Sequence, residues 1–301
     1  DALRQDGAVR INGTPVDPAG SPVIGDEVDI AGHVYDSVGG GGQGRLQVLA
    51  RTIPERITGR VNVHCGIHKC MTEFSKKVYG KLCRPSLLPG GSFEHFFHRV
   101  DAFYNHGVEH SIASVSGHVL DLDRFDDIRV ARFVRDPRDL LVSGYYYHKR
   151  CAEHWCGLEQ ATELDWAIVH GAIPDALQDG RSLSRFLEES SLEEGLIAEL
   201  EFRRQHFEAM RAWPEDERVR VYRYEDVLGA ERRTFAELLG FFRLPLIART
   251  AGSYYAHRYR ARGAGGKRGH IRNAATGQWR DHFSPALKRR FESEYGDVLE
   301  R

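Results

Sequence analysis

Two spacings of apolar residues alternate along most of the chain. Residues 61–65 alternate apolar and polar side chains and end at Gly66, which predicts a strand followed by a turn. Between 74 and 82 the apolar residues then recur every four positions, which predicts a helix that begins near Thr72. This stretch therefore predicts a strand, a turn and a helix in succession.

The same succession returns later in the sequence. A strand at 128–134 runs into a turn with Pro137, a residue typical of helix starts, and a helix follows at 140–149. Alternating strands and helices indicate an α/β fold, with a central parallel sheet and helices on both of its faces. Further elements are predicted as a long amphipathic helix at 191–213, a strand at 219–222, a helix at 230–242 and a last helix capped by Ser284 and Pro285.

The N-terminal part has a different pattern. Residues 9–11 and 28–30 alternate and are bounded by Asn-Gly and Gly-Asp turn signals, which predicts short β-strands. A Gly-rich stretch at 39–44 is typical of a flexible linker. We therefore expect an acidic, β-rich segment with its linker at 1–44 and the main domain at 45–301.

The charges nearly cancel over the whole chain but not within it. The 301 residues include 42 Lys or Arg and 43 Asp or Glu, which argues against a nucleic-acid binder or a polybasic membrane-surface protein. Locally, 1–42 holds seven acidic and two basic residues, whereas 257–290 holds ten basic residues and one acidic. The Gly- and Arg-rich part of the second stretch is typical of a loop that closes over a small anion, although a solvated basic loop has the same composition.

The cysteines and the hydropathy of the sequence indicate the compartment in which the protein is expected to work. The five cysteines form no CxxC pair, so we expect a reducing, cytoplasmic compartment and no metal site. Whether Cys151 and Cys156 are bridged stays open. The sequence contains no apolar run of about 18 residues, so we expect no transmembrane segment.

Two of the predicted turns have chemistry suited to anions. Lys69 and Thr72 lie at a helix N-terminus, where backbone N–H groups and the helix dipole favour an anion. His68 stands where a Walker A loop requires Gly, so the turn does not match that motif. Arg135 follows the second strand, and Ser143 comes eight residues later, so both can reach one phosphate. A surface lysine and a helix-capping network are the plainer alternatives.

Three runs of residues, taken together, point to a family. Residues 130–146 (VARFVRDPRDLLVSGYY), 222–226 (YRYED) and 271–283 (IRNAATGQWRDHF) follow the Gly-x-x-Lys turn at 66–69. In this order they resemble the motifs of sulfotransferases that use 3′-phosphoadenosine-5′-phosphosulfate (PAPS). The resemblance implies a P-loop-like sulfotransferase fold, PAPS as the co-substrate and adenosine 3′,5′-bisphosphate (PAP) as the product.

The resemblance also assigns roles to individual residues. It implies that Lys69 and Thr72 bind the 5′-phosphosulfate, and that Lys69 stabilises the leaving group. The surrounding loop would comprise Lys69, Cys70, Met71, Thr72 and Glu73. The 3′-phosphate ligands would be Arg135, Ser143 and Arg272, the last followed by Asn273 and Ala274. The adenine would lie near Phe74, Tyr224, Ser253 and Tyr254.

The sequence departs from the family pattern in both loops. Met71 stands where the family has a Gly that permits close backbone approach. Glu73 adds an acid near the expected phosphate. The family's Lys-Gly pair is Asn273-Ala274 here. These changes affect the expected geometry of the loops more than the expected chemistry.

An acceptor hydroxyl or amine would also need a general base. We expect His118, after a predicted strand end, because His titrates near neutral pH and relatives place a His comparably. Glu94, His95 and His98 are alternatives. The acceptor is expected to be a small molecule or carbohydrate, with a pocket formed by 83–107 and 151–179. A P-loop-type nucleotide kinase and a non-catalytic nucleotide-binding protein on the same scaffold are the competing hypotheses.

Overall fold

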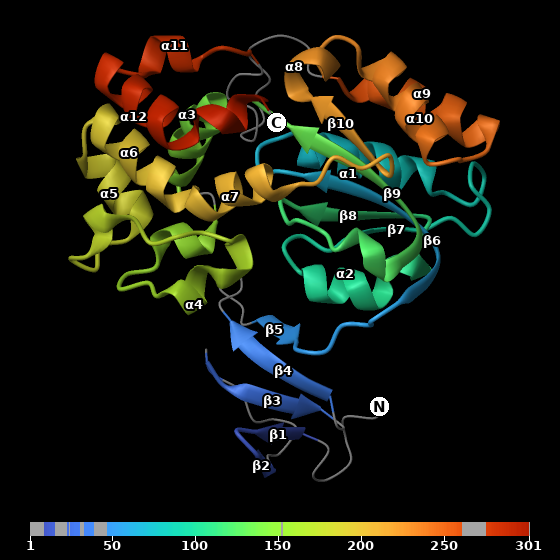
Figure 1. Cartoon of the computed structure of the whole chain (residues 1–301), viewed down its shortest axis with the longest axis horizontal. Coiled ribbons are helices and arrows are strands. Elements are labelled where there is room, and N and C mark those ends of the chain that lie inside the picture. Colours follow the sequence, from blue (N-terminus) through green and yellow to red (C-terminus); the bar gives the residue numbers. More distant parts are fainter. Residues whose placement is uncertain are drawn as a thin grey trace. The chain divides into compact units, whose positions relative to one another are not determined.

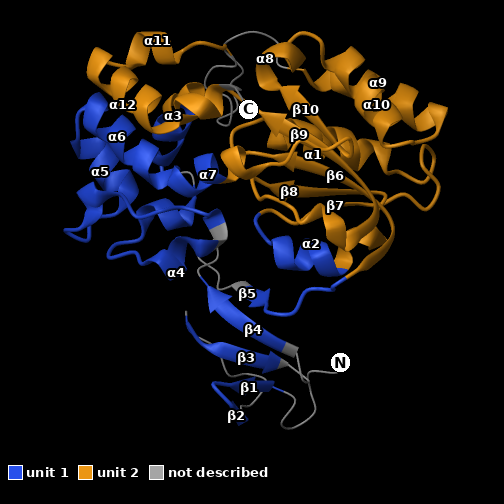
Figure 2. Cartoon of the chain, viewed as in Figure 1, with its two compact units in different colours: residues 1–55, 98–105, 143–208 blue, residues 56–97, 106–142, 209–301 orange. Residues whose placement is uncertain are grey.

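A computed structural model describes residues 9–15, 23, 25–30, 33–38, 47–151, 153–260 and 275–300. The chain divides into two compact units (Figure 2). The first unit comprises Asp1–Glu55, His98–Asn105 and Ser143–Glu208, and the second comprises Arg56–Phe97, His106–Val142 and Ala209–Arg301. The expected division after residue 44 stays a prediction, and the Gly-rich linker lies outside the described residues.

A five-stranded parallel sheet forms the centre of the second unit (Figure 1). Its order is β10-β9-β6-β8-β7, and every neighbouring pair is parallel. The strands are β6 (Ile57–Gly66), β7 (Phe93–His95), β8 (Ile112–Ser116), β9 (Phe125–Val134) and β10 (Val219–Arg223). The predicted strands at 61–65, 128–134 and 219–222 are thus confirmed, and β6 and β9 begin earlier than predicted.

Helices flank this sheet and complete the predicted α/β fold. The helices of the second unit are α1 (Thr72–Leu82), α8 (Tyr224–Val227), α9 (Glu231–Phe241), α10 (Leu246–Tyr259), α11 (Trp279–His282) and α12 (Pro285–Tyr295). Helix α10 packs against both α1 and α9. It does so with small residues, because its buried face consists mainly of Ala248, Gly252, Ser253 and Ala256. Ser284 caps α12 as predicted, accepting a hydrogen bond from the Leu287 N–H at 3.1 Å.

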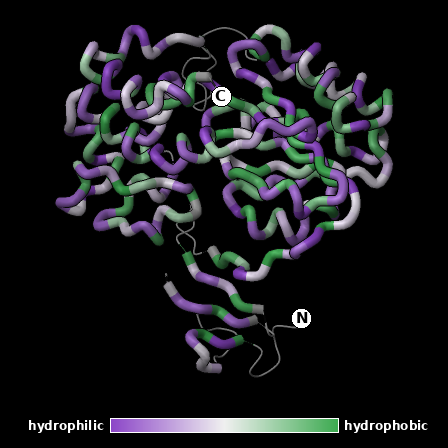
Figure 3. The backbone as a smooth tube through the Cα atoms, in the orientation of Figure 1, coloured by the Kyte–Doolittle hydropathy of each residue, from purple (hydrophilic) through white to green (hydrophobic). Residues whose placement is uncertain are grey.

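The N-terminal strands form a separate antiparallel sheet in the first unit. Its order is β2-β1-β3-β4-β5, and the expected β-rich segment is confirmed. Figure 3 shows both hydrophilic and hydrophobic residues along these strands. Its buried residues in the described part of the chain include Val28, Ser37 and Val38. The strands are β1 (Val9–Ile11), β2 (Thr14–Pro15), β3 (Glu27–Ile30), β4 (His33–Val38) and β5 (Gln47–Ala50).

Helices make up most of the rest of the first unit. They include α2 (Val100–His106), α3 (Pro137–His148), which begins in the second unit, α4 (Glu163–Trp166), α5 (Leu183–Glu189), α6 (Leu192–Phe202) and α7 (Arg204–Ala212). The predicted single helix at 191–213 is wrong, because the chain leaves helical geometry at Arg203. The Nε of this residue instead donates to Glu199 at 2.7 Å, and both side chains are fully buried. No helix in the described part of the chain is long and apolar enough to cross a membrane.

Candidate functional site

Four neighbouring parallel strands end at one edge of the sheet, and each leads to an expected site residue. In open α/β sheets ligands bind outside the carboxyl ends of the strands. The register places Gly66 of β6 between Ser116 of β8 and Phe133 of β9. The fold therefore gathers four segments of distant sequence, in which β6 leads to Lys69, β8 to His118, β9 to Arg135 and β10 to Tyr224.

The loop after β6 is tight and conformationally strained. The Cys70 N–H donates to the Ile67 carbonyl at 2.9 Å. Lys69 and Met71 have φ angles of 72° and 59°, in the left-handed region that non-Gly residues rarely adopt. Strain of this kind costs about 1–2 kcal/mol per residue and clusters at functional sites. Met71 makes no side-chain capping bond to α1, so the first N–H groups of that helix are positioned for an anion.

The structure accommodates the loop residues that depart from the family pattern. Met71 adopts the left-handed conformation that Gly takes without steric cost, so the chain path keeps a glycine-like turn. Burial raises the pKa of Cys70 to about 12, against the opposing charge of Arg135, and the thiol stays neutral. Glu73 is exposed, and its carboxylate lies 2.8 Å from the Lys76 ammonium. The acid near the expected phosphate therefore has a cation beside it.

Arg135 connects the candidate site residues of the second unit. Its side chain is buried, with 5% exposed, and its guanidinium lies over the Tyr224 ring at 4.5 Å. One terminal nitrogen donates to the Lys69 carbonyl at 3.3 Å, which joins the two anion-suited turns. The Nε is buried and has no hydrogen-bond partner within the described ranges. A phosphate oxygen is the kind of acceptor that satisfies such a donor.

The expected adenine contacts lie on three elements of the second unit. Phe74 of α1 is half-buried, and its ring packs edge-on against Phe235 of α9 at 5.4 Å. Tyr224 is buried beneath Arg135. Ser253 is buried in α10 and donates to the Thr250 carbonyl at 3.0 Å, whereas Tyr254 is 54% exposed. Their roles toward adenine stay predictions.

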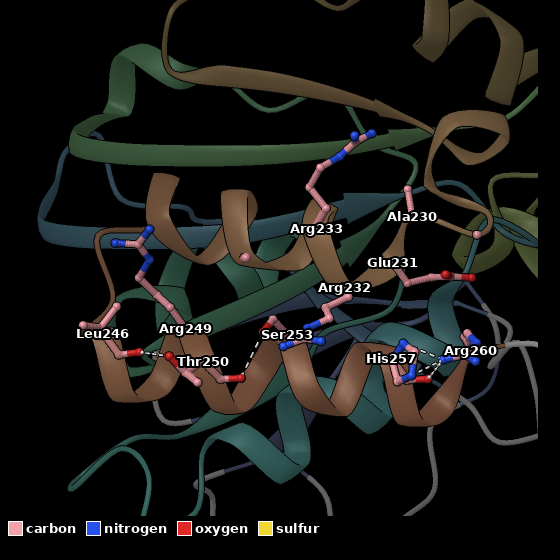
Figure 4. Close-up of a pocket in the computed structure, with 12 residues that line it drawn as sticks. Ala230, Glu231, Arg232, Arg233, Leu246, Arg249, Thr250, Ser253, His257 and Arg260 are labelled. Atoms are coloured by element: carbon pink, nitrogen blue, oxygen red, sulfur yellow. Dashed lines mark hydrogen bonds between the residues drawn. The ribbon is translucent and has the colours of Figure 1, made fainter.

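A groove of about 850 Å³ runs between α9 and α10 (Figure 4). Ser253 lies on its wall, but Tyr254 does not. The positive charges of the groove come from Arg232 and Arg233 of α9, Arg249 of α10, and Arg260. The first three precede the basic stretch found in the sequence, so sequence analysis missed them as a group. The signal available was two adjacent Arg residues in the predicted helix at 230–242 and a further Arg at position 249, shortly after that helix.

His118, the expected base, follows β8 by two residues and is half-buried. The Gly117 N–H donates to the Gly66 carbonyl at 2.9 Å, and the Cys65 thiol donates to the His118 carbonyl at 3.5 Å. These contacts attach the turn after β8 to the end of β6. The alternative base His95 is more deeply buried, and burial lowers its pKa to about 4.

The structure does not place the remaining expected ligands relative to these residues. Ser143 is half-buried in α3 and belongs to the first unit. Arg272, Asn273 and Ala274 lie outside the described residues. No group of three or more His, Cys, Asp or Glu side chains that could hold a metal occurs in the described ranges.

Comparison with protein families identifies the class of protein. The model described as "Sulfotransferase domain" matches residues 124–301, more than half of the chain, so the chain belongs to this family. This family transfers a sulfuryl group from PAPS and releases PAP, and the chain is therefore a PAPS-dependent sulfotransferase. The match confirms the resemblance carried by the three sequence motifs. It also favours this activity over the kinase and non-catalytic alternatives.

Other comparisons give distant similarity only. No curated protein matches the chain. Among solved structures, mouse sulfotransferase SULT7A1 complexed with PAP is 12% identical, with a TM-score of 0.46 over 80% of this chain and 84% of that chain. Retinol dehydratase in a complex with retinol and PAP is 13% identical, with a TM-score of 0.42 over 89% and 90% of the respective chains.

Proposed function

We propose that the chain transfers the sulfuryl group of PAPS to a hydroxyl or amine of a small-molecule or carbohydrate acceptor at the carboxyl edge of the parallel sheet. The observation that carries this proposal is the contact between Arg135 and the Lys69 carbonyl. It joins an arginine suited to a phosphate with the loop at the start of α1, where a second anion is favoured. Two anion sites side by side fit a nucleotide with phosphate groups at both ends.

In this proposal each end of the nucleotide has its own ligands. Lys69, Thr72 and the backbone of the loop through Cys70, Met71 and Glu73 hold the 5′-phosphosulfate. Arg135, Ser143 and the segment at 272–274 hold the 3′-phosphate. Phe74, Tyr224, Ser253 and Tyr254 surround the adenine. The buried Nε of Arg135 supports the 3′-phosphate assignment, because a desolvated guanidinium binds an anion more strongly than an exposed one does.

The proposed reaction is an in-line displacement at sulfur. His118 takes the proton of the acceptor O–H or N–H as the acceptor atom bonds to sulfur, and the bond from sulfur to the bridging oxygen of PAPS breaks. PAP leaves with the electron pair of that bond, and Lys69 stabilises the developing negative charge. The low pKa of His95 makes it a weaker base than an ordinary histidine, which favours His118.

The acceptor is proposed only as a class of molecules, whereas the donor is proposed as a particular nucleotide. The retinol dehydratase structure named above contains retinol, a small-molecule alcohol. We propose the aromatic segments at 83–107 and 151–179 as the acceptor pocket, because flat apolar rings suit both sugars and apolar alcohols. We also propose that the protein is cytoplasmic and that the chain divides into an N-terminal segment at 1–44 and the main domain at 45–301.

The proposal is tested by substituting Arg135→Ala and titrating two nucleotides by calorimetry. A charge-assisted hydrogen bond contributes about 1.5–3 kcal/mol, so PAP should bind roughly 10- to 100-fold more weakly. Adenosine 5′-phosphate, which lacks the 3′-phosphate, should change by less than about threefold. Arg289→Ala, an exposed arginine of α12, is the matched control. Equal losses for both nucleotides would contradict the assignment of the 3′-phosphate to Arg135.

Turnover tests the reaction itself. Labelled PAPS offered with phenols, steroid alcohols, sugars and amines should label one acceptor class. A chain that binds PAP but labels none of the acceptors would contradict the proposed acceptor range. Stabilisation by ATP with magnesium, but not by PAP, would contradict the donor.

A further inference from the structure

Asp139 connects the turn after β9 with a segment near the C-terminus. Its carboxylate accepts hydrogen bonds from the backbone N–H groups of Gly277 at 2.6 Å and of Trp279 at 3.0 Å. The side chain is only 1% exposed. A buried carboxylate that accepts two N–H groups makes strong bonds, and its removal would leave both donors without that partner. The bonded residues are 138 and 140 positions apart in the sequence, so these bonds hold together two distant segments of the chain.

A second contact holds the same segment. The Arg138 guanidinium lies 3.8 Å from the centre of the Trp279 ring, which is a close cation–π contact. Arg138 also pairs with Asp136 at 2.7 Å, and the Asp136 N–H donates to Glu225 at 3.0 Å. The turn after β9 is thereby bonded to the segment after β10 and to the start of α11.

This network reaches the proposed phosphate ligand directly. The second terminal nitrogen of Arg135 lies 3.5 Å from the Ala275 carbonyl, two residues before Gly277. The Arg135 guanidinium is thus held by the Lys69 carbonyl, the Ala275 carbonyl and the Tyr224 ring. Asp139 fixes where the Ala275 carbonyl lies, because it anchors the backbone two residues further along. A guanidinium between two carbonyls is aimed in one direction, which favours bidentate recognition of a phosphate.

We propose that Asp139 is a positioning residue for the 3′-phosphate end of the nucleotide, acting through residues 275–279 on the guanidinium of Arg135. This inference rests on the proposed function, in which Arg135 binds the 3′-phosphate. In this proposal Asp139 acts without contacting the nucleotide or the sulfuryl group, because its two carboxylate oxygens accept the N–H groups of Gly277 and Trp279. Its effect is therefore on the affinity for PAPS and on discrimination between nucleotides with and without a 3′-phosphate, not on the chemical step.

The test is the nearly isosteric substitution Asp139→Asn, with PAP and adenosine 5′-phosphate titrated by calorimetry. The asparagine keeps one acceptor oxygen and presents an NH₂ group to the other backbone N–H, so one of the two bonds is lost. We expect PAP to bind about tenfold more weakly and adenosine 5′-phosphate to change by less than about threefold. With PAPS as the varied substrate, KM should rise while kcat stays close to that of the wild type.

Two further variants keep the test decisive. Asp281→Asn changes an exposed acid of α11 in the same way and should bind both nucleotides like the wild type. If Asp139→Asn does not fold, Arg138→Gln removes the contact with Trp279 from the other side of the network, and the same selective loss for PAP is expected. Equal weakening of both nucleotides, or unchanged PAP affinity in a folded Asp139→Asn chain, would overturn the inference. A wild-type chain that binds both nucleotides equally would instead refute the 3′-phosphate site itself.

Discussion

Acidification should destabilise the protein through His64, which lies in the central strand β6 two residues before Gly66. The side chain is 1% exposed. Its Nδ1 lies 3.1 Å from the Tyr79 hydroxyl, and its ring lies 4.3 Å from that of Phe133. Burial lowers the pKa of His64 to about 3. The folded chain therefore keeps this imidazole neutral at pH values where an unfolded chain protonates it.

The magnitude follows from the two pKa values. In the unfolded chain the pKa is about 6.5, so near pH 5 the charged form exceeds the neutral form by roughly 30-fold. The unfolded state binds the proton and the folded state does not, so the free energy of unfolding falls as pH drops below about 6.5. Near pH 5 this single group removes about 2 kcal/mol, and the loss continues to grow until the pH approaches about 3.

Urea unfolding at about pH 7.5 and pH 5 measures this effect when the wild type is compared with His64→Gln. Glutamine can still bond to Tyr79 but does not titrate, so the variant should lose about 2 kcal/mol less than the wild type between the two pH values. His154→Gln, at an exposed position, should behave as the wild type does. The reasoning would be refuted if the wild type and His64→Gln lost the same free energy on acidification.

Two further predictions concern the proposed base and a buried ion pair. His118→Ala should lower turnover by about tenfold or more while PAP affinity stays unchanged, because only the proton acceptor is removed; unchanged turnover would exclude His118 from the mechanism. Gly144→Ala should destabilise the fold by about 3 kcal/mol or more in urea unfolding, because the added methyl group would overlap the carboxylate of Glu199 and come within 2.6 Å of Arg203. The control Gly80→Ala, in α1 with open space around it, should be neutral or stabilising.

The sequence predicts those elements whose signals are local. The start of α1 at Thr72 follows from the apolar spacing at 74–82, and α3 begins at Pro137, the residue that signals a helix start. The fold class could likewise be predicted, because alternating strands and helices indicate a parallel sheet.

Elements that depend on tertiary packing could not be predicted in this way. Helix α10 is absent from the predicted elements because small residues such as Ala248, Gly252 and Ala256 cover much of its buried face, and they carry a weak hydropathy signal. The break between α6 and α7 falls at Arg203, a good helix former with no Gly or Pro beside it. Local sequence therefore gives no signal for the break, and the burial of Arg203 with its partner Glu199 becomes visible only in the folded chain.

In the candidate site, too, residues with a local sequence signal could be predicted and residues that act through tertiary contacts could not. Lys69 and Arg135 could be named from their turns and His118 from its place after a predicted strand, whereas Tyr224 and the detailed roles came only from the resemblance to the family. The sheet order then places all four residues after neighbouring strand ends. Asp139 could not be named in this way, because nothing in its sequence neighbourhood indicates a bond to Gly277. Such contacts become visible only once the chain is folded.

The hydrogen bond between Gly117 and Gly66 has a consequence for how the reaction centre is prepared. It fastens the turn that carries His118 to the end of the strand that carries the Lys69 loop. The turn after β8 cannot move away from the end of β6 without breaking this bond. If His118 is the proton acceptor and Lys69 the leaving-group cation, as proposed, part of their relative position is set during folding, which lowers the entropy lost when PAPS and its acceptor bind.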